Sequence, residues 1–221
     1  MNKGQFLVGP SVRLAMVMTL ACTGWMACSN PADNVPAAAV ADPVAAPEAD
    51  AMGESLTYTL AEETTISFTG SKVTGIHEGG FNSFEGTITL VEGDPLRSSL
   101  QLTIDTDSMW TDAEKLTGHL KSADFFDVEN HPTATFTSTE IVPAAEGYVI
   151  TGNLDLHGVT RSITFPAAIE VAPGGVKATA EFSLMRFDFG IVYPGKKDDL
   201  IRDEVVVKFD LVATPGAEQD A

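Results

Sequence analysis

Four histidines, His77, His119, His131 and His157, carry the side chains best suited to metal ligation or to proton transfer near neutral pH. A metal site needs three or four ligands that converge on one point. No two of these histidines stand at the i, i+4 spacing of a helical zinc pair. The spacing therefore predicts no metal site, although folding can still bring separate histidines together.

Other catalytic patterns are missing from the sequence. There is no Gly-x-Ser-x-Gly motif, and the two cysteines, Cys22 and Cys28, both lie near the N-terminus. The many carboxylates single out no acid and base pair. Gly79 and Gly80 precede neither a helix nor a Lys-Ser/Thr pair, which favours a tight turn or bulge over a phosphate loop. We expect a protein that is not an enzyme and needs no cofactor.

The elements that position these side chains are expected to be strands. Apolar and polar residues alternate with a period of two around Ile66–Phe68, Leu100–Ile104 and Val205–Leu211, a pattern typical of half-buried antiparallel strands. Further candidate strands, separated by turn signals, are 86–91, 133–142, 147–156, 161–171 and 176–186. About eight strands over residues 56–214 predict one all-β domain, a barrel or a sandwich.

One segment breaks the alternation. Thr111 and Glu114 have the spacing of a capping box, which predicts a short helix over residues 111–121. Leu116 and Leu120, at i and i+4, would form its buried stripe. We expect this helix to plug one end of a barrel or to lie over its mouth.

The N-terminal segment has the pattern of an export signal. Lys3 and Arg13 precede an apolar run over residues 14–27 that is short for a membrane-spanning helix. A small residue before Cys28 resembles the cleavage site of a bacterial lipoprotein, so residues 1–28 are predicted to be a signal peptide and Cys28 the lipidated residue. Cys22 is the alternative, and cleavage without lipidation is the other interpretation.

Composition separates the rest of the chain into a spacer, a domain and a tail. Residues 29–55 consist mainly of Ala, Pro, Asp and Glu, which predicts a disordered linker before the domain and its tail at residues 215–221. The 221-residue chain has a net charge of -18, which argues against nucleic-acid binding. Together with the signal, this predicts a periplasmic protein held at the membrane by a lipid anchor.

Several motifs, in this order, resemble the YceI-like family of extracytoplasmic lipid-binding proteins. They lie within Phe68–Phe81, Phe84–Ile88, Thr117–Asp127, His131–Phe136 and Gly152–Arg161. The resemblance spans residues 56–214 and implies an extended antiparallel β-barrel of about eight strands, lipocalin-like, whose apolar tunnel holds a polyisoprenoid such as an isoprenoid quinone or another long-chain lipid. It also leaves a homodimer open.

Aromatic residues recur through the domain, and an eight-stranded barrel either fills its interior or holds one small apolar ligand. Phe125 and Phe126 would gate the tunnel or pack the helix down, with packing favoured, and His157 is expected to orient a turn by hydrogen bonding. The residues that we expect to line a tunnel are Phe68, Phe81, Phe84, Trp110, Phe125, Phe126, Phe136, Phe182 and Phe189.

The sequence thus predicts a protein that stores or shuttles a long-chain lipid outside the cytoplasm. The alternative is a filled barrel whose acidic exterior meets a partner in the cell envelope, as an interaction or stress protein without a small-molecule ligand. A cavity inside the barrel distinguishes the two hypotheses.

Overall fold

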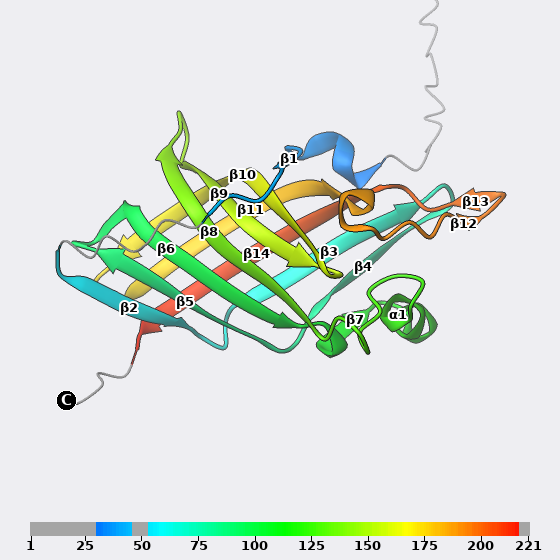
Figure 1. The fold of residues 1–221 in the computed structure, drawn as a ribbon, viewed down its shortest axis with the longest axis horizontal. Helices are drawn as coiled ribbons and strands as arrows, with labels where there is room; N and C mark the ends of the chain where they lie inside the picture. Colours follow the sequence, from blue (N-terminus) through cyan, green and yellow to red (C-terminus); the bar gives the residue numbers. More distant parts are fainter. Residues whose placement is uncertain (1–29, 46–52, 217–221) are drawn as a thin grey trace, which may run out of the picture.

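The computed structural model describes residues 30–45 and 53–216, and over these ranges the chain is almost entirely β-structure with one short α-helix (Figure 1). The predicted signal peptide, Cys22, Cys28 and residues 217–221 lie outside the described residues. Across the described ranges, no helix has the length and apolar character needed to span a membrane.

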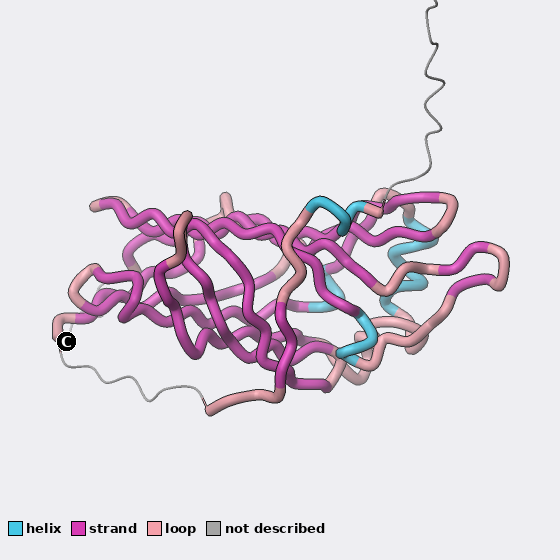
Figure 2. The backbone as a smooth tube through the Cα atoms, turned by 90° about the horizontal axis from the view of Figure 1, so that it is seen from above, coloured by secondary structure: helices cyan, strands magenta, loops and turns pink. Residues whose placement is uncertain are grey.

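The described elements follow the expected strand pattern closely. The strands are β1 Ala39–Ala41, β2 Ser55–Leu60, β3 Thr65–Lys72, β4 Gly75–Phe81, β5 Phe84–Val91, β6 Asp94–Asp105, β7 Met109–Thr111, β8 Thr133–Pro143, β9 Tyr148–Leu156, β10 Val159–Ala172, β11 Gly175–Met185, β12 Gly195–Lys196, β13 Asp199–Leu200 and β14 Glu204–Pro215. The helical segments are η1 Pro31–Asn34, η2 Thr106–Ser108, α1 Glu114–Lys121 and η3 Arg186–Phe189. Figure 2 shows these helical segments gathered toward one end of an elongated body.

Eight strands close a ring in the order β10, β9, β8, β6, β5, β2, β14 and β11, and β11 pairs again with β10. The pairs of this ring are antiparallel. β14 also pairs with β3, from which β4 and β7 continue the sheet beyond the ring toward α1 (Figure 1). The predicted extended antiparallel barrel is confirmed.

Alternation along the strands decides which side chains face the interior. In β11, Val176, Ala178, Ala180 and Phe182 are buried, whereas the residues between them are exposed. Successive side chains of a strand point to opposite faces, so this one strand presents an apolar row to the barrel interior and a polar row to solvent.

Gly79 and Gly80 lie inside β4, so the tight turn is wrong, whereas the close backbone approach that the family resemblance implies for these glycines is confirmed. A Cβ atom on Gly79 would lie 2.5 Å from Cζ of Phe68, and one on Gly80 would lie 2.7 Å from the carbonyl oxygen of Ile66. Glycine is therefore needed here so that the Phe68 ring and the backbone can approach the strand closely.

The short helix is confirmed, but its predicted capping box is not formed. α1 begins at Glu114 after Ala113, which makes no side-chain cap. Thr111 is the last residue of β7, and its hydroxyl contacts Ala113 and the hydroxyl of Thr117 instead. Thr111 is held in β7 by its pairing with Gly79, and the helix begins only after Ala113. Thr111 therefore does not occupy the N-cap position.

Residues 30–45 form a strap along the barrel wall, so the prediction of a disordered linker is wrong for this part of the chain. β1 pairs with β10, while the backbone of Ala38 donates to the carbonyl of Ser183 in β11 at 2.9 Å. β10 and β11 pair with each other only through residues 168–172 and 175–179. The strap fills the gap where they diverge, since both strands there have backbone groups without a partner in each other.

Further contacts hold the strap at both ends. The side-chain amide of Asn153 bonds both the N–H and the C=O of Val44, and Arg161 pairs with Asp42 at 3.1 Å. At the other end, η1 packs against β3 and β14. Val206 of β14 faces out of the barrel, because its neighbour Val207 lines the cavity, yet Val206 is buried.

Gly152→Ala is predicted to destabilise the barrel by about 2 kcal/mol, because overpacking a close contact costs about 1–3 kcal/mol. A Cβ atom there would lie 2.3 Å from Cζ of Phe136 and 2.6 Å from the carbonyl oxygen of Thr137. The matched control is Gly70→Ala, because no atom lies within 4 Å of a Cβ at Gly70. Urea denaturation measures both variants, and equal stabilities would contradict the prediction.

Candidate functional site

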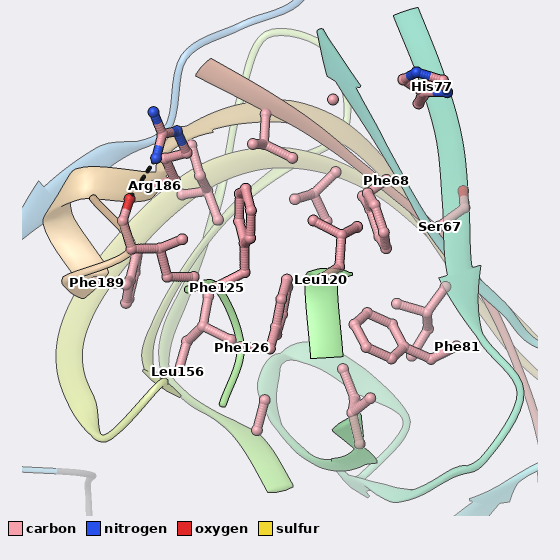
Figure 3. A pocket seen from close by; sticks show the side chains of 18 of the residues that line it. Ser67, Phe68, His77, Phe81, Leu120, Phe125, Phe126, Leu156, Arg186 and Phe189 are labelled. Atoms are coloured by element: carbon pink, nitrogen blue, oxygen red, sulfur yellow. Dashed lines mark hydrogen bonds between the residues drawn. The ribbon is translucent and has the colours of Figure 1, made fainter. Parts of the chain in front are cut away.

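One half of the barrel interior is hollow. An apolar cavity of about 430 Å³ lies between the ring strands, β3, α1 and η3. Figure 3 shows aromatic and aliphatic side chains pointing into it from opposite walls, with Leu120 of α1 between them. A completely filled barrel, the alternative interpretation of the sequence, is therefore not what the described residues form.

The other half of the interior is packed solid. Leu90, Ile150, Val176 and Ala213 are each at most 1% exposed and do not line the cavity. Where the packed half meets the hollow half, the rings of Phe165 and Phe182 stack at a centroid distance of 4.2 Å. Aromatic side chains thus form the closed inner end of the cavity.

Seven of the nine predicted lining residues line this cavity. They are Phe68, Phe81, Phe125, Phe126, Phe136, Phe182 and Phe189. Their contact with a ligand stays a prediction, but the fold brings them together from β3, β4, the loop after α1, β8, β11 and η3.

Trp110 and Phe84 do not line the cavity, and their assignment as lining residues is corrected. In β7, Met109 is 3% exposed and faces inward, so Trp110 faces out and is 41% exposed. Phe84 begins β5 and packs against the hydrophobic core from its side. The identity of a residue as aromatic does not fix the face of the strand on which it lies.

Two groups of aromatic rings stand at the helix end of the cavity. Phe126 lies 6.5 Å from Phe68 and 6.2 Å from Phe81, measured between ring centroids. Phe125 packs instead against His119 of α1 and against Tyr193, at 5.1 Å from each. Phe125 therefore packs the helix down as predicted and also lines the cavity, whereas Phe126 packs against the opposite cavity wall. Leu116 and Leu120 are half-buried and line the cavity rather than a closed core.

Many aliphatic residues that were not predicted to do so also line the cavity, although the period-two pattern places them on the inward face. They occupy inward-facing positions of β6, β9 and β14 and include Leu102, Ile104, Leu154, Leu156 and Val207. Their inward position follows from alternation, but alternation does not tell a hollow interior from a filled one.

A group of polar side chains lines the other side of the cavity. This group reaches the protein surface at Lys196, which is exposed. It comprises Ser71, Lys72, Arg186, Lys196, Asp199 and Arg202. Ser71 is 6% exposed, and its hydroxyl has no hydrogen-bond partner within the described residues. A buried hydroxyl without a partner costs free energy, so it is suited to bond a polar group of a ligand.

Arg186 organises this polar side from within. Its guanidinium is buried and donates to the carbonyls of Ile191 and Arg202 at 2.7 and 3.1 Å, and to Asp203 at 3.1 Å. Burial lowers the pKa of Arg186, and the neighbouring carboxylate of Asp203 opposes that effect. The arginine stays charged and, through Arg202 and Asp203, ties η3 to the segment before β14.

Asp199 holds the β12–β13 hairpin against β3. Its carboxylate accepts from Lys72 and from the hydroxyl of Thr74, the latter at 2.8 Å. The hydrogen bond from Lys72 keeps the pKa of Asp199 below its usual value of 3.8.

This pairing predicts a pH-dependent contribution to stability. Because the pKa of Asp199 is lowered in the folded state, its contribution is complete above about pH 4 and is lost as the pH falls through the lowered pKa. We expect Asp199→Asn to lower the melting temperature by a few degrees at most, since the pair is partly exposed. The difference from the unmutated protein should be constant from pH 7 to about 4 and vanish below that range.

Thermal denaturation between pH 7 and 3 measures this difference, with the exposed neighbour Asp198→Asn as the control. A gap between Asp199→Asn and the unmutated protein that widens as the pH falls would contradict the assignment.

The histidines separate into two groups. His77 and His119 form isolated pairs with Asp112 and Asp124 at 2.8 and 2.9 Å, and the hydrogen bond from His77 lowers the pKa of Asp112. His131 and His157 lie side by side, with ring centroids 4.8 Å apart. His157 is hydrogen-bonded to the carbonyl of Phe189, so its predicted role as a hydrogen bonder is confirmed.

Comparison with known proteins agrees with this architecture. The family model for the YceI-like domain matches residues 58–213. A UPF0312 protein of Pectobacterium carotovorum is 44% identical over 91 residues, which are 41% of this chain and 47% of the relative. The match therefore spans about half the length of that curated relative.

Two solved structures share the fold. BcnA of Burkholderia cenocepacia superposes with a TM-score of 0.62 and 26% identity over 69% of this chain and 97% of BcnA. A polyisoprenoid binding domain from Saccharophagus degradans, implicated in plant cell wall breakdown, superposes with a TM-score of 0.59 and 20% identity, over 73% of this chain and 99% of that domain.

Proposed function

This chain belongs to the YceI-like family, and from that premise we propose that it binds a long-chain lipid in the barrel cavity. The proposed ligand is an isoprenoid lipid, such as an isoprenoid quinone, or a similar long-chain amphiphile. The proposed role is storage or shuttling of this lipid outside the cytoplasm. The observation that carries the proposal is the cavity of about 430 Å³, apolar in its depth and polar on one side. Binding, not catalysis, is the proposed activity.

The wall of the cavity suits a hydrocarbon chain. Burial of each methylene group contributes about 0.8 kcal/mol, so a prenyl or acyl chain needs only a dry apolar space. Phe136, Phe182 and Leu156 offer such a surface without polar atoms. The Saccharophagus degradans domain, which has the same fold, is described as polyisoprenoid-binding, and this supports the choice of ligand class.

The asymmetry of the cavity suggests an orientation for the ligand. The apolar end of the chain would lie against the stacked rings of Phe165 and Phe182. The headgroup would then lie near Ser71 and Lys72, where a buried hydroxyl and a cation are within reach of the cavity. A polar headgroup in this place would satisfy the Ser71 hydroxyl.

The cellular setting is part of the same proposal. Lipidation at Cys28, or at Cys22, would anchor the protein at the outer face of a bacterial membrane, in the periplasm, where an isoprenoid lipid is at hand. Neither cysteine lies among the described residues. A homodimer stays a prediction.

The experiment that tests the function is extraction and mass spectrometry of the apolar material that stays with the protein after purification from its own host without denaturant. We expect a polyisoprenoid or another long-chain amphiphile at close to one molecule per barrel. A protein that carries no lipid and also fails to bind added isoprenoid quinone or polyprenyl alcohol would overturn the proposal.

A further inference from the structure

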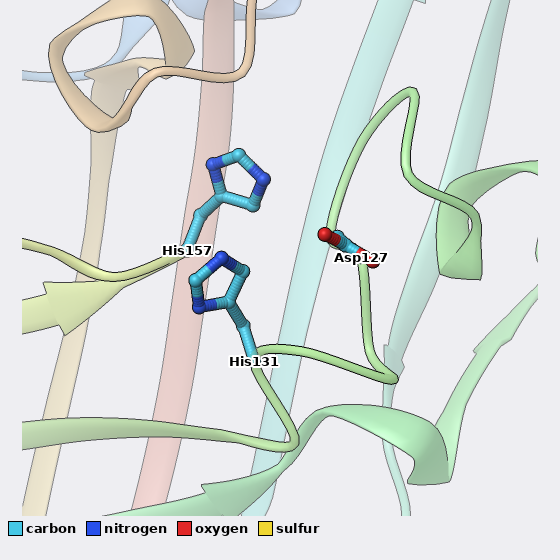
Figure 4. A group of neighbouring side chains, drawn as sticks. All are labelled: Asp127, His131 and His157. Atoms are coloured by element: carbon cyan, nitrogen blue, oxygen red, sulfur yellow. The ribbon is translucent and has the colours of Figure 1, made fainter.

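We propose that Asp127, His131 and His157 form a binding site for a divalent transition metal ion, with Zn²⁺ as the best match. One ligand atom from each residue lies within 4.8 Å of the others. Figure 4 shows the two imidazole rings side by side, with Asp127 facing them from the loop that follows α1. Asp127 and His131 are four residues apart but lie in a loop and not in a helix, and His157 is distant in the sequence, so the site arises only from the fold.

His157 is oriented as a metal ligand is. It stands at the β9–β10 turn with a left-handed φ of 54°, and its Nδ1 lies 3.2 Å from the carbonyl oxygen of Phe189. A carbonyl can only accept, so Nδ1 carries the proton and Nε2 keeps its lone pair. Metal-bound histidines usually donate their second ring nitrogen to such a carbonyl, which fixes the tautomer and the ring plane.

His131 brings a second imidazole whose ring has no hydrogen bond within the described residues. Its backbone is held on both sides: its N–H donates to the carbonyl of Asp127 at 2.8 Å, and its carbonyl accepts from the hydroxyl of Thr106 at 2.7 Å. Gly158 leaves room for the ring, because a Cβ atom there would lie 2.6 Å from Cε1 of His131. The backbone of His131 is thus held in place, and its half-buried ring is available to bind a metal ion.

Asp127 completes the set with a carboxylate. It adopts a left-handed φ of 46°, and one of its oxygens accepts from the side-chain amide of Asn130 at 2.9 Å. The bond from Asn130 orients the carboxylate and leaves the other oxygen for a cation.

The ligand set selects the metal. Two imidazoles and one carboxylate match three-ligand zinc sites that leave a fourth position open to water, with bonds of about 2.0–2.2 Å. Tetrahedral ligands at those bond lengths stand about 3.3–3.6 Å apart. The three groups are close enough that small side-chain rotations would bring them to the ion.

A bound ion would link three segments that also build the cavity. Asp127 and His131 belong to the loop that carries Phe125 and Phe126, and His157 is tied to Phe189 in η3. Metal binding would therefore stiffen the wall of the cavity at these aromatic residues.

The test is Zn²⁺ titration by calorimetry of the protein purified without a histidine tag and freed of metal with a chelator. We expect one Zn²⁺ per chain with a micromolar or lower Kd. His131→Gln and Asp127→Asn should each weaken binding at least tenfold. The matched control is Glu129→Gln, an exposed carboxylate of the same loop outside the cluster, which should bind as the unmutated protein does.

Two further measurements keep the test decisive if a variant misfolds. Circular dichroism establishes the fold of each variant, and X-ray absorption of the zinc-loaded unmutated protein should show two imidazoles and an oxygen ligand. The proposal is overturned if the folded, metal-free protein binds no Zn²⁺. It is also overturned if folded His131→Gln and Asp127→Asn both bind it as tightly as Glu129→Gln.

Discussion

Val207→Trp is expected to reduce the lipid that copurifies with the protein at least tenfold while the barrel stays folded. Val207 is a half-buried residue of β14 that lines the cavity and pairs with Phe182 on one side and Phe68 on the other. An indole in this position projects into the space that the hydrocarbon chain needs. Phe136 and Phe182 are less suitable targets, because both also belong to the buried core.

The matched control is Lys208→Trp, which adds the same side chain to the exposed face of the same strand. Extraction and mass spectrometry of both variants, with circular dichroism to establish folding, gives the comparison. Full lipid content in a folded Val207→Trp protein would mean that the ligand does not occupy this cavity. Loss in both variants would point to a damaged barrel instead.

Arg186→Met is expected to lower the free energy of unfolding by about 3 kcal/mol, because buried acceptors that lose their donor cost about 1–3 kcal/mol each. The substitution keeps much of the apolar stem, but it removes the donors to the carbonyls of Ile191 and Arg202 and the partner of Asp203. Asp203 is partly exposed and regains water, so most of the loss comes from the two carbonyls.

The control is Arg161→Met, which removes an ion pair with Asp42, whose side chain is 93% exposed. Exposed pairs contribute about 0–1 kcal/mol, so this variant should be nearly as stable as the unmutated protein. Urea denaturation measures both free energies. A loss below about 1 kcal/mol for Arg186→Met would show that water replaces the arginine at these carbonyls.

The strands could be predicted because their burial follows local alternation. β11 and β14 each carry a buried row and an exposed row that can be read from the residues alone. β4 could not be predicted in the same way. Its glycines signal a turn, and the reason for them is the Phe68 ring on the neighbouring strand, which is a contact made only in the fold.

The candidate site could be predicted from the sequence only in part. Aromatic identity correctly indicated Phe136 and Phe182, but it failed for Trp110, because strand register and not residue type decides which face is inward. The polar side of the cavity and the group of Asp127, His131 and His157 depend on loops that meet across the end of the barrel. No local sequence pattern predicts such long-range contacts.

If the chain is lipidated at Cys28 or Cys22, the strap would set how far the barrel can stand from the membrane. Asn30, at its start, is only 8% exposed, and η1 packs against β3 and β14. If Cys28 carries the lipid, two residue steps separate the anchor from the barrel. Because a residue spans at most about 3.5 Å, such a tether would reach at most about 7 Å.

So short a tether would keep the barrel close to the headgroups, which would shorten the path of a lipid from the bilayer to the cavity. An anchor at Cys22 adds six residues, or about 20 Å of reach, and lets the barrel swing clear. Lipidation at Cys28 would therefore keep the barrel at the membrane surface, whereas lipidation at Cys22 would let it move away from that surface.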